Sequence, residues 1–279
     1  MRADGKRLKH FDPMYTVAAH IMAKRSDAMN MTTIDIPAEP MQRYINQTRK
    51  EGRGVSHLAL ILAAYVRTVA EFPALNRFVV NKRVFARNEI RIGMVVLKAG
   101  QEGGTMSKIL LSADDTVDEV NRKINEYVAE NRITPEENGT EKLIKKLLGL
   151  PGLLRVGVPI LKWMDKHGLL PKSIIDASPF HASMSITNLA SIKTDSIYHH
   201  CYDFGTTSLF LAMGNFHEVP RRQKGEIVFE RCMPIGVVMD ERICDGHYYA
   251  TAFRVFKRYL AHPEVLEQKP AEVKVDPEL

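Results

Sequence analysis

The spacing of apolar and polar residues changes its period several times along the chain, and these changes predict a mixed α/β fold. Residues 56–73, SHLALILAAYVRTVAEFP, are strongly apolar between an opening serine and a closing proline, which predicts a buried helix. Residues 112–132 carry apolar residues at helical spacing and predict an amphipathic helix. Residues 41–52 predict a further helix, and a last one is expected from Gly246 to Leu260.

Several shorter runs have the residue types and alternation of β-strands. They comprise residues 31–40, 77–87, 89–97, 181–189, 207–216, 225–233 and 234–240. The first of these runs after the buried helix is RFVVNKRVFAR (77–87). It predicts a hairpin that turns at Asn81 and Lys82. Because helices and strands intermix without strict βαβ alternation, we expect one mixed-sheet α/β domain over residues 1–266. The charged residues 267–279 are expected to form a flexible tail.

Residues 133–180 differ in composition from the rest of the chain and predict a helical insert. They are rich in leucine and lysine and hold the only tryptophan, Trp163. One interpretation is a helix that lies on an acidic membrane surface through residues 141–175. The other, which we prefer, is a helical hairpin that covers an active-site entrance or packs on a neighbouring subunit. This preference rests on residues that would interrupt a long membrane-lying helix, namely Gly149, Pro151, Gly152, Gly157 and Pro159.

Composition and charge narrow the classes of function. The 279 residues carry a formal net charge of +6, but basic residues are spread out among acidic ones, so we expect no nucleic-acid partner. Cys201, Cys232 and Cys244 show neither metal-ligand nor disulfide spacing, which favours a reducing cytoplasm and no metal. The opening residues MRADGKRLKHFDPMY lack the apolar core of a signal peptide, and no apolar run reaches the roughly 18 residues of a membrane span.

Four segments resemble one acyltransferase family, in the same order along the chain. They are FPALNRF (72–78), IRIGMVVL (90–97), SMSITNLAS (183–191) and MDERICDGHYYATAFRVFKRYLAHPEVL (239–266). Each is similar to a segment in the catalytic domain of the dihydrolipoyl acyltransferases of 2-oxo acid dehydrogenase complexes. That family shares its fold with chloramphenicol acetyltransferase. The resemblance implies a chloramphenicol acetyltransferase-like mixed β-sheet sandwiched with helices, and it covers most of the chain apart from the insert.

The resemblance also implies a reaction, the transfer of an acyl group between the thiols of coenzyme A and a dihydrolipoyl arm. Such chemistry needs a base for the thiol proton and a donor for the oxyanion of the tetrahedral intermediate. By position in the family pattern, Thr187 is the oxyanion donor, Asp245 is the structural aspartate and Arg242 is the family's arginine. The family's catalytic histidine is replaced here by Glu241, four residues before Asp245.

Glu241 leaves two interpretations open. As a base, a carboxylate with a reference pKa of about 4.3 is weaker than a histidine at about 6.5, unless burial raises its pKa. As a surface residue, which is the interpretation we prefer, Glu241 pairs with Arg242 or Arg254 and takes no part in chemistry. His247 is a second candidate base, and its alternative is a capping or packing role.

Three further features are interpreted as structural. Residues 199–205, HHCYDFG, resemble a related histidine signature with altered spacing, and we interpret them as a loop from which His199 or His200 reaches at most a neighbouring subunit's site. Cys244 lies inside a turn and is expected to pack. The glycines between residues 100 and 104 lack the spacing of a phosphate-binding loop.

Together these patterns predict a coenzyme-A-dependent acyltransferase with an altered or impaired catalytic base. The alternative is a catalytically inactive homologue that serves as an oligomeric scaffold or ligand-binding protein. The candidate site residues are Glu241, Thr187, Asp245 and His247. By resemblance we expect coenzyme A or acyl-coenzyme A as substrate and a homotrimer, or a larger assembly built from trimers. We expect no lipoyl domain in this chain, so another molecule would supply the acyl acceptor.

Overall fold

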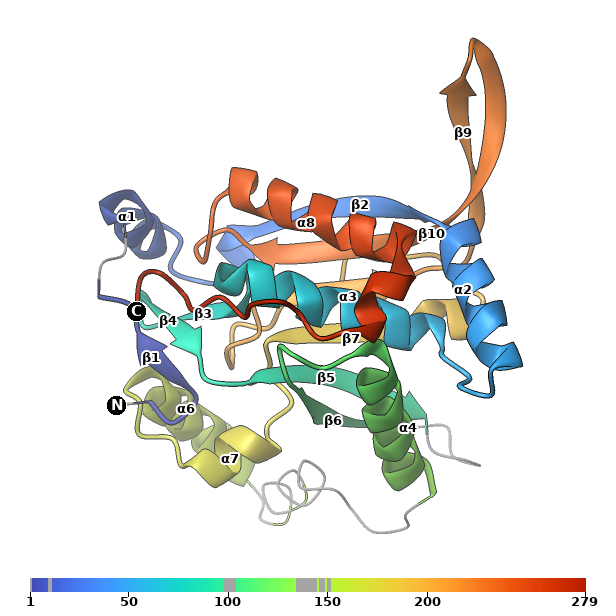
Figure 1. Cartoon of the computed structure of the whole chain (residues 1–279). Coiled ribbons are helices and arrows are strands. Elements are labelled where there is room, and N and C mark those ends of the chain that lie inside the picture. Colours follow the sequence, from blue (N-terminus) through green and yellow to red (C-terminus); the bar gives the residue numbers. More distant parts are fainter. Residues whose placement is uncertain (1, 10–11, 98–103, 134–144, 146–148, 150–151) are drawn as a thin grey trace.

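A seven-stranded mixed sheet forms the centre of the molecule (Figure 1). The computed structural model describes residues 2–9, 12–97, 104–133, 145, 149 and 152–279. The strand order is β2–β10–β8–β7–β5–β6, and β9 pairs with the outer part of β10. β7 lies parallel to both β5 and β8, and the other pairs are antiparallel. The strands are β2 (Met29–Pro37), β5 (Ile90–Leu97), β6 (Gly104–Leu111), β7 (Met184–Asn188), β8 (Leu209–Met213), β9 (His217–Gln223) and β10 (Glu226–Asp240).

Helices cover one face of this sheet, and a smaller sheet lies at one end. In Figure 1, α3 and α8 run across the sheet, whereas α6 and α7 lie beside β1. The small sheet has the order β1–β4–β3, with β1 (Gly5–Arg7), β3 (Arg77–Val80) and β4 (Arg83–Arg87). The helices are α1 (Pro13–Ile21), α2 (Ala38–Lys50), α3 (His57–Glu71), α4 (Val117–Ile133), α6 (Leu153–Lys166), α7 (Lys172–Ala177) and α8 (Gly246–Ala261).

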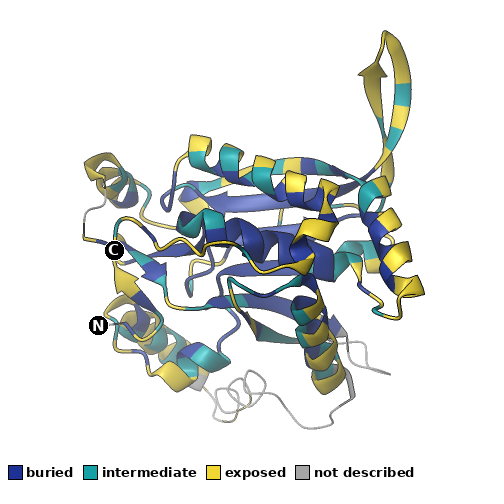
Figure 2. Cartoon of the chain, in the orientation of Figure 1, coloured by how far each residue is buried: buried dark blue, intermediate teal, exposed yellow. Residues whose placement is uncertain are grey.

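The two faces of the sheet bury different sets of side chains. Leu211 and Val237 point toward the helices and belong to the main core, whereas Phe210 and Val238 point the other way and pack with Cys201. This follows from the period of two in a strand. Figure 2 shows the buried residues gathered in the sheet and along α3, while β9 and the outer part of β10 that pairs with it are mostly exposed.

An irregular segment after β7 crosses the face of the sheet that the helices leave open. Its backbone runs so close to β10 that a Cβ built on Gly236 would lie 2.2 Å from the carbonyl oxygen of Ile197. The hydroxyl of Tyr198 lies 2.7 Å from Thr33 Oγ1 on β2, so the same segment also contacts the neighbouring strand. Residues 193–202, which we call the crossing segment, therefore lie against β10 and β2.

The strongest local predictions are confirmed. The apolar run forms α3, and the Ser56 side chain accepts a hydrogen bond from Ala59 N at 3.1 Å, as expected for an N-cap. The predicted hairpin forms β3 and β4, and its turn residues Asn81 and Lys82 both have positive φ. The amphipathic helix forms α4 (Val117–Ile133), which begins five residues after the start of the predicted range.

Other predictions are corrected by the structure. The two strands expected over 225–240 form the single strand β10. Pro234 does not break it, because the pairing of β10 with β8 ends at Ile235 and the missing N–H removes no bond there. The tail expected to be loose lies against the fold: Asp276 is buried and bonds Arg77 at 2.6 Å, and Lys274 N donates to Ala70 O at 2.8 Å.

Only part of the predicted insert lies within the described residues. α6 and α7 are helical, as predicted for residues 133–180. Residues 134–144, 146–148 and 150–151 of the insert, and the glycines at 100 and 103, lie outside the described residues. Across the ranges described above, no helix combines the length and the apolar character needed to cross a bilayer.

Candidate active site

The corner between β10 and α8 brings together three of the four candidate residues. β10 ends at Asp240, and Glu241 begins the turn that leads to α8. Asp245 is the N-cap of α8, and its carboxylate accepts a hydrogen bond from Tyr248 N at 2.6 Å. His247 lies in the first turn of α8 with an exposed side chain. The local sequence fixes this corner, because an aspartate before a helix satisfies one of the free N–H groups of the first turn.

Glu241 is half-buried and is held by the start of β2. Its backbone N–H donates to Ala28 O at 2.9 Å, and its Oε2 accepts a hydrogen bond from Asn30 Nδ2 at 2.6 Å. The arginine partners expected from the sequence are engaged elsewhere: Arg242 bonds Asp240, and Arg254 donates to Thr251 Oγ1 at 3.0 Å. The carboxylate of Glu241 therefore accepts a hydrogen bond from a neutral amide and does not form the expected pair with Arg242 or Arg254.

A buried ion cluster lies directly beneath the corner. Asp240 is fully buried, and Arg242 donates to it from Nε at 2.8 Å and from Nη2 at 2.6 Å. Arg25 approaches the same carboxylate from the N-terminal segment, with Nε 3.5 Å from Oδ2. Arg242 also donates to Met22 O at 2.9 Å. Because a buried charge is costly unless it is paired, this cluster fixes the position of the backbone that carries Glu241.

Tyr15 of α1 contacts the N-cap of α8. Burial, together with a hydrogen bond to the carboxylate of Asp245, raises the pKa of Tyr15 to about 12. The hydrogen bond from Tyr248 N lowers the pKa of Asp245, and Tyr15 and His247 act in the same direction. Asp245 is therefore a stable carboxylate that caps the helix, in line with the structural role that the family resemblance implied. No sequence pattern points to Tyr15, because α1 is remote from Asp245 in the chain.

Cys244 lies inside the same turn, and its thiol is out of reach of a substrate. It is buried in the main core, and burial raises the pKa of its thiol. A thiol with a raised pKa is a poor nucleophile at neutral pH. The packing role predicted for this cysteine fits its position.

Thr187 lies far from the corner within one chain. It pairs with Ala212 of β8, which in turn pairs with Gly236 of β10. Glu241 follows Gly236 by five residues. At roughly 3.3 Å per residue along a strand and roughly 4.8 Å between strands, Thr187 and Glu241 lie on the order of 19 Å apart. One copy of the chain cannot place both side chains on the same acyl group.

The histidines of the crossing segment lie on the face of the sheet that carries Thr187. The ring of His199 stacks on Phe210, with centroids 4.2 Å apart and an interplanar angle of 9°. Phe210 pairs with Ser185, which lies two residues before Thr187 on the same side of β7. His200, which follows His199 in the crossing segment, is exposed. Within one copy, His199 is therefore nearer to Thr187 than Glu241 is.

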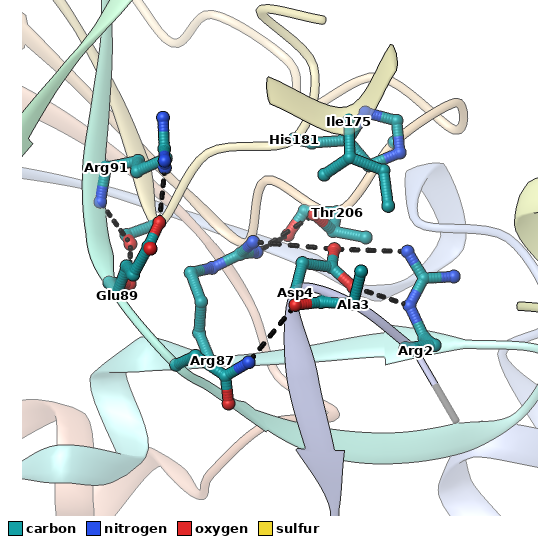
Figure 3. Close-up of polar contacts among 12 residues, drawn as sticks. Arg2, Ala3, Asp4, Arg87, Glu89, Arg91, Ile175, His181 and Thr206 are labelled. Atoms are coloured by element: carbon teal, nitrogen blue, oxygen red, sulfur yellow. Dashed lines mark hydrogen bonds and ion pairs between the residues drawn. The ribbon is translucent and has the colours of Figure 1, made fainter. Parts of the chain in front are cut away.

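A second cluster of buried ionisable side chains lies where β1, β4 and the helical insert meet (Figure 3). Arg2 bonds Asp4 at 2.9 Å and Asp165 of α6 at 2.7 Å. His181 Nε2 lies 3.3 Å from Asp165 Oδ1, and burial lowers the pKa of His181. Arg87, the last residue of β4, places its Nη1 3.8 Å from Oδ2 of Asp4. Because these groups bond one another and are buried, we interpret the cluster as a structural joint.

Lys108 of β6 strengthens this joint. Its Nζ donates to the carbonyl oxygens of Ile175 at 2.6 Å and His181 at 2.9 Å. Burial lowers the pKa of Lys108 to about 7. The adjacent cavity measures only about 20 Å³ and is too small for a substrate. Within the described ranges, no set of three or more His, Cys, Asp or Glu side chains is arranged to hold a metal ion.

Comparison with known proteins connects this geometry to a family. The model of the 2-oxoacid dehydrogenases acyltransferase catalytic domain matches residues 181–267, which include β7 and the β10–α8 corner. A comparison with curated protein sequences finds no significant match.

Solved structures extend the similarity over nearly the whole chain. A probable dihydrolipoamide acetyltransferase from Listeria monocytogenes 4b F2365 superposes with a TM-score of 0.59 and 14% identity, over 97% of this chain and 99% of the other. The dihydrolipoamide acetyltransferase of Azotobacter vinelandii gives 0.58 and 11%, over 92% and 93%. A chloramphenicol acetyltransferase gives 0.54 and 12%, over 92% and 99%. The chain therefore has the chloramphenicol acetyltransferase-like fold and resembles the catalytic domain of the 2-oxoacid dehydrogenase acyltransferases.

Proposed function

We propose that the chain is a coenzyme-A-dependent acyltransferase whose active site is completed by two copies of the chain. Thr187 of one copy stabilises the oxyanion, and the β10–α8 corner of the next copy, with Glu241 and His247, handles the thiol proton. The observation that carries this proposal is the register across β7, β8 and β10, from which ideal strand spacings place Thr187 and Glu241 on the order of 19 Å apart within one chain. Two residues so far apart can serve one reaction only across an interface.

The spacing of the corner residues supports the assignment. The structural work on the Azotobacter vinelandii enzyme concerns a serine, a histidine and an asparagine in its catalytic mechanism, the last two being four residues apart. Glu241 and Asp245 have the same spacing here, and Thr187 on β7 is a hydroxyl residue that precedes them in the chain. A hydroxyl placed near a thioester carbonyl can donate to its oxyanion, and a carboxylate can accept the thiol proton. Two solved relatives are multienzyme-complex cores, which fits a trimer-based assembly.

A second candidate function is a non-catalytic relative that uses the fold as an oligomeric scaffold. The observation that favours it is the bond from Asn30 to Glu241, which engages one carboxylate oxygen. General-base catalysis commonly contributes about 10²–10⁴ in rate, so a weak base would leave a slow enzyme rather than none. The two candidates therefore differ first in whether the chain binds acyl-coenzyme A.

Calorimetric titration with coenzyme A and acetyl-coenzyme A tests the proposal directly. Acetyl transfer to dihydrolipoamide is then followed by chromatography of the acetylated product, in the wild type and in Thr187→Val and Glu241→Gln. Thr187→Val keeps the shape of the side chain and removes the hydroxyl. We expect binding by all three proteins and a loss of transfer in both variants. Absence of binding at millimolar ligand leaves the scaffold function.

Mixing the two inactive variants tests the shared site. If each site takes Thr187 from one copy and Glu241 from another, co-refolded Thr187→Val and Glu241→Gln chains contain some intact sites and regain part of the activity. Light scattering on the same sample gives the oligomeric state. A mixture as inactive as its components contradicts a site between copies. A monomer that is active contradicts it as well.

A further inference from the structure

α6 presents an apolar stripe to solvent on the outside of the molecule. Val156, Ile160 and Trp163 recur at helical spacing and are 60%, 50% and 55% exposed. The opposite side of α6 packs on the fold, where Asp165 is buried. We call these three residues the outer stripe. Figure 1 places α6 beside β1, on the far side of the molecule from α2 and the β9–β10 hairpin.

The helix that carries the outer stripe is continuous. α6 runs from Leu153 to Lys166 with Pro159 inside it, and Gly157 does not break it. Gly157 and Pro159 were expected to interrupt a long membrane-lying helix, which favoured a packing role for the insert. Neither residue interrupts α6.

Four lysines form a lysine rim, and two of them, Lys162 and Lys166, belong to α6 itself. They line one cavity of about 420 Å³ between α6, the turn after α1 and the β3–β4 hairpin. The members of the rim are Lys24, Lys82, Lys162 and Lys166. In the part of the chain that the structure describes, none of the four has an ion-pair partner.

The acidic residues of this cavity do not neutralise the lysine rim. Asp165 is 5% exposed and bonds Arg2 at 2.7 Å. Asp203 accepts hydrogen bonds from the backbone N–H of Arg25 at 2.8 Å and of Ser26 at 3.1 Å. Asp165 is thus paired with Arg2, whereas Asp203 is exposed and keeps its negative charge. The four lysines still outnumber this one carboxylate, so the cavity carries a net positive charge.

We propose that the outer stripe and the lysine rim form a docking face for an anionic phospholipid surface. An apolar stripe that carries a tryptophan and is bordered by lysines is the arrangement by which a helix lies at a membrane interface. The cavity gives a phosphate headgroup a hollow with four cations around it. A protein partner fits this face less well, because lysine is depleted at the centres of protein interfaces. The docking face is independent of the proposed acyl transfer.

Electrostatics sets the expected strength of docking. A lysine near an anionic leaflet raises membrane affinity by about fivefold, so the rim of four contributes on the order of several hundred-fold. Three apolar side chains on one short helix give only weak attachment without that charge. Docking should therefore be strong on anionic membranes, weak on zwitterionic ones and sensitive to salt.

Vesicle sedimentation tests the proposal, and Trp163 reports on it because it is the only tryptophan of the chain. The full-length protein is mixed with phosphatidylcholine vesicles, with or without phosphatidylglycerol, at low and high salt and fixed pH. We expect the protein to sediment with the anionic vesicles and the Trp163 emission to shift to the blue. The double variant Lys162→Gln/Lys166→Gln should bind about 25-fold more weakly. Ile160→Ser should weaken binding and reduce the shift.

A matched control removes two lysines elsewhere. Lys50→Gln/Lys224→Gln changes the net charge equally, at the end of α2 and in the β9–β10 turn, and should bind as the wild type does. Equal weakening by both double variants overturns the proposal, because net charge alone would then explain binding. So does equal sedimentation with both vesicle types at low salt.

Two other occupants are separated by the same samples. If a second copy covers the outer stripe, anionic vesicles do not bind, and light scattering shows Ile160→Ser dissociating an oligomer. If the cavity takes a small free anion, inorganic phosphate raises the melting temperature of the wild type but not of Lys162→Gln/Lys166→Gln, and vesicles again do not bind. Either result overturns the membrane assignment.

Discussion

Replacing Arg242 by methionine tests whether the buried ion cluster holds the β10–α8 corner. Asp240 is fully buried and receives two side-chain hydrogen bonds from Arg242, at 2.8 Å and 2.6 Å. In Arg242→Met the remaining charged partner is Arg25, with its Nε 3.5 Å away. Breaking a buried ion pair costs about 3–5 kcal/mol, and Arg25 places the expected loss near the lower end, at about 3 kcal/mol. That is a large share of the stability of a typical domain, which is about 5–15 kcal/mol.

Urea unfolding followed by circular dichroism measures this loss. Arg254→Met is the matched control, because Arg254 is exposed on α8 and should leave the unfolding free energy close to the wild-type value. A loss below about 1 kcal/mol in Arg242→Met would refute the argument that buried charge fixes the corner.

Three further changes test other parts of the structure. Gly236→Ala should lower the free energy of unfolding in urea by about 1–3 kcal/mol, because the added Cβ would lie 2.2 Å from Ile197 O. Gly246→Ala is the control and should leave the free energy of unfolding unchanged, because open space surrounds Gly246. An equal loss in both variants contradicts the close approach of Ile197 to Gly236. Burial lowers the pKa of Lys108 to about 7 from 10.5, so the unfolded chain binds more protons above pH 7 and stability rises with pH. From pH 7 to 9 the wild type should gain about 2 kcal/mol more than Lys108→Met, and equal slopes in urea unfolding contradict this. Glu241→His should raise acetyl transfer to dihydrolipoamide by about tenfold or more at pH 7.5, since imidazole is the stronger base; an unchanged rate excludes a base role at this position.

The sequence by itself determined the elements whose signals are local. α3 follows from an apolar run with a capping serine, and the β3–β4 hairpin follows from two apolar strands around Asn81 and Lys82. The β10–α8 corner follows from an aspartate that caps the next helix, at Asp245. In each case the hydrogen bonds that fix the conformation join residues a few positions apart, so the pattern and its cause lie in the same short segment.

Only the tertiary structure decided which distant residues meet. Glu241 bonds Asn30 instead of a neighbouring arginine, and Arg25 joins the buried cluster beneath it. Neither partner has a sequence signal, because strand order brings the start of β2 beside the end of β10. The separation of Thr187 from Glu241 has the same origin, since it depends on the register across β7, β8 and β10.

The tail and the insert show why composition alone misleads. The tail is charged, but Asp276 pairs with the buried Arg77, and the backbone N–H of Lys274 donates to Ala70 of α3. These contacts offset the conformational entropy lost when the tail is ordered. In the insert, the sequence identified an amphipathic segment but not which side packs. The fold buries the side with Asp165 and leaves Trp163 outward. A hydrophobic pattern determines that a helix has two faces, and only the surrounding structure determines which face reaches solvent.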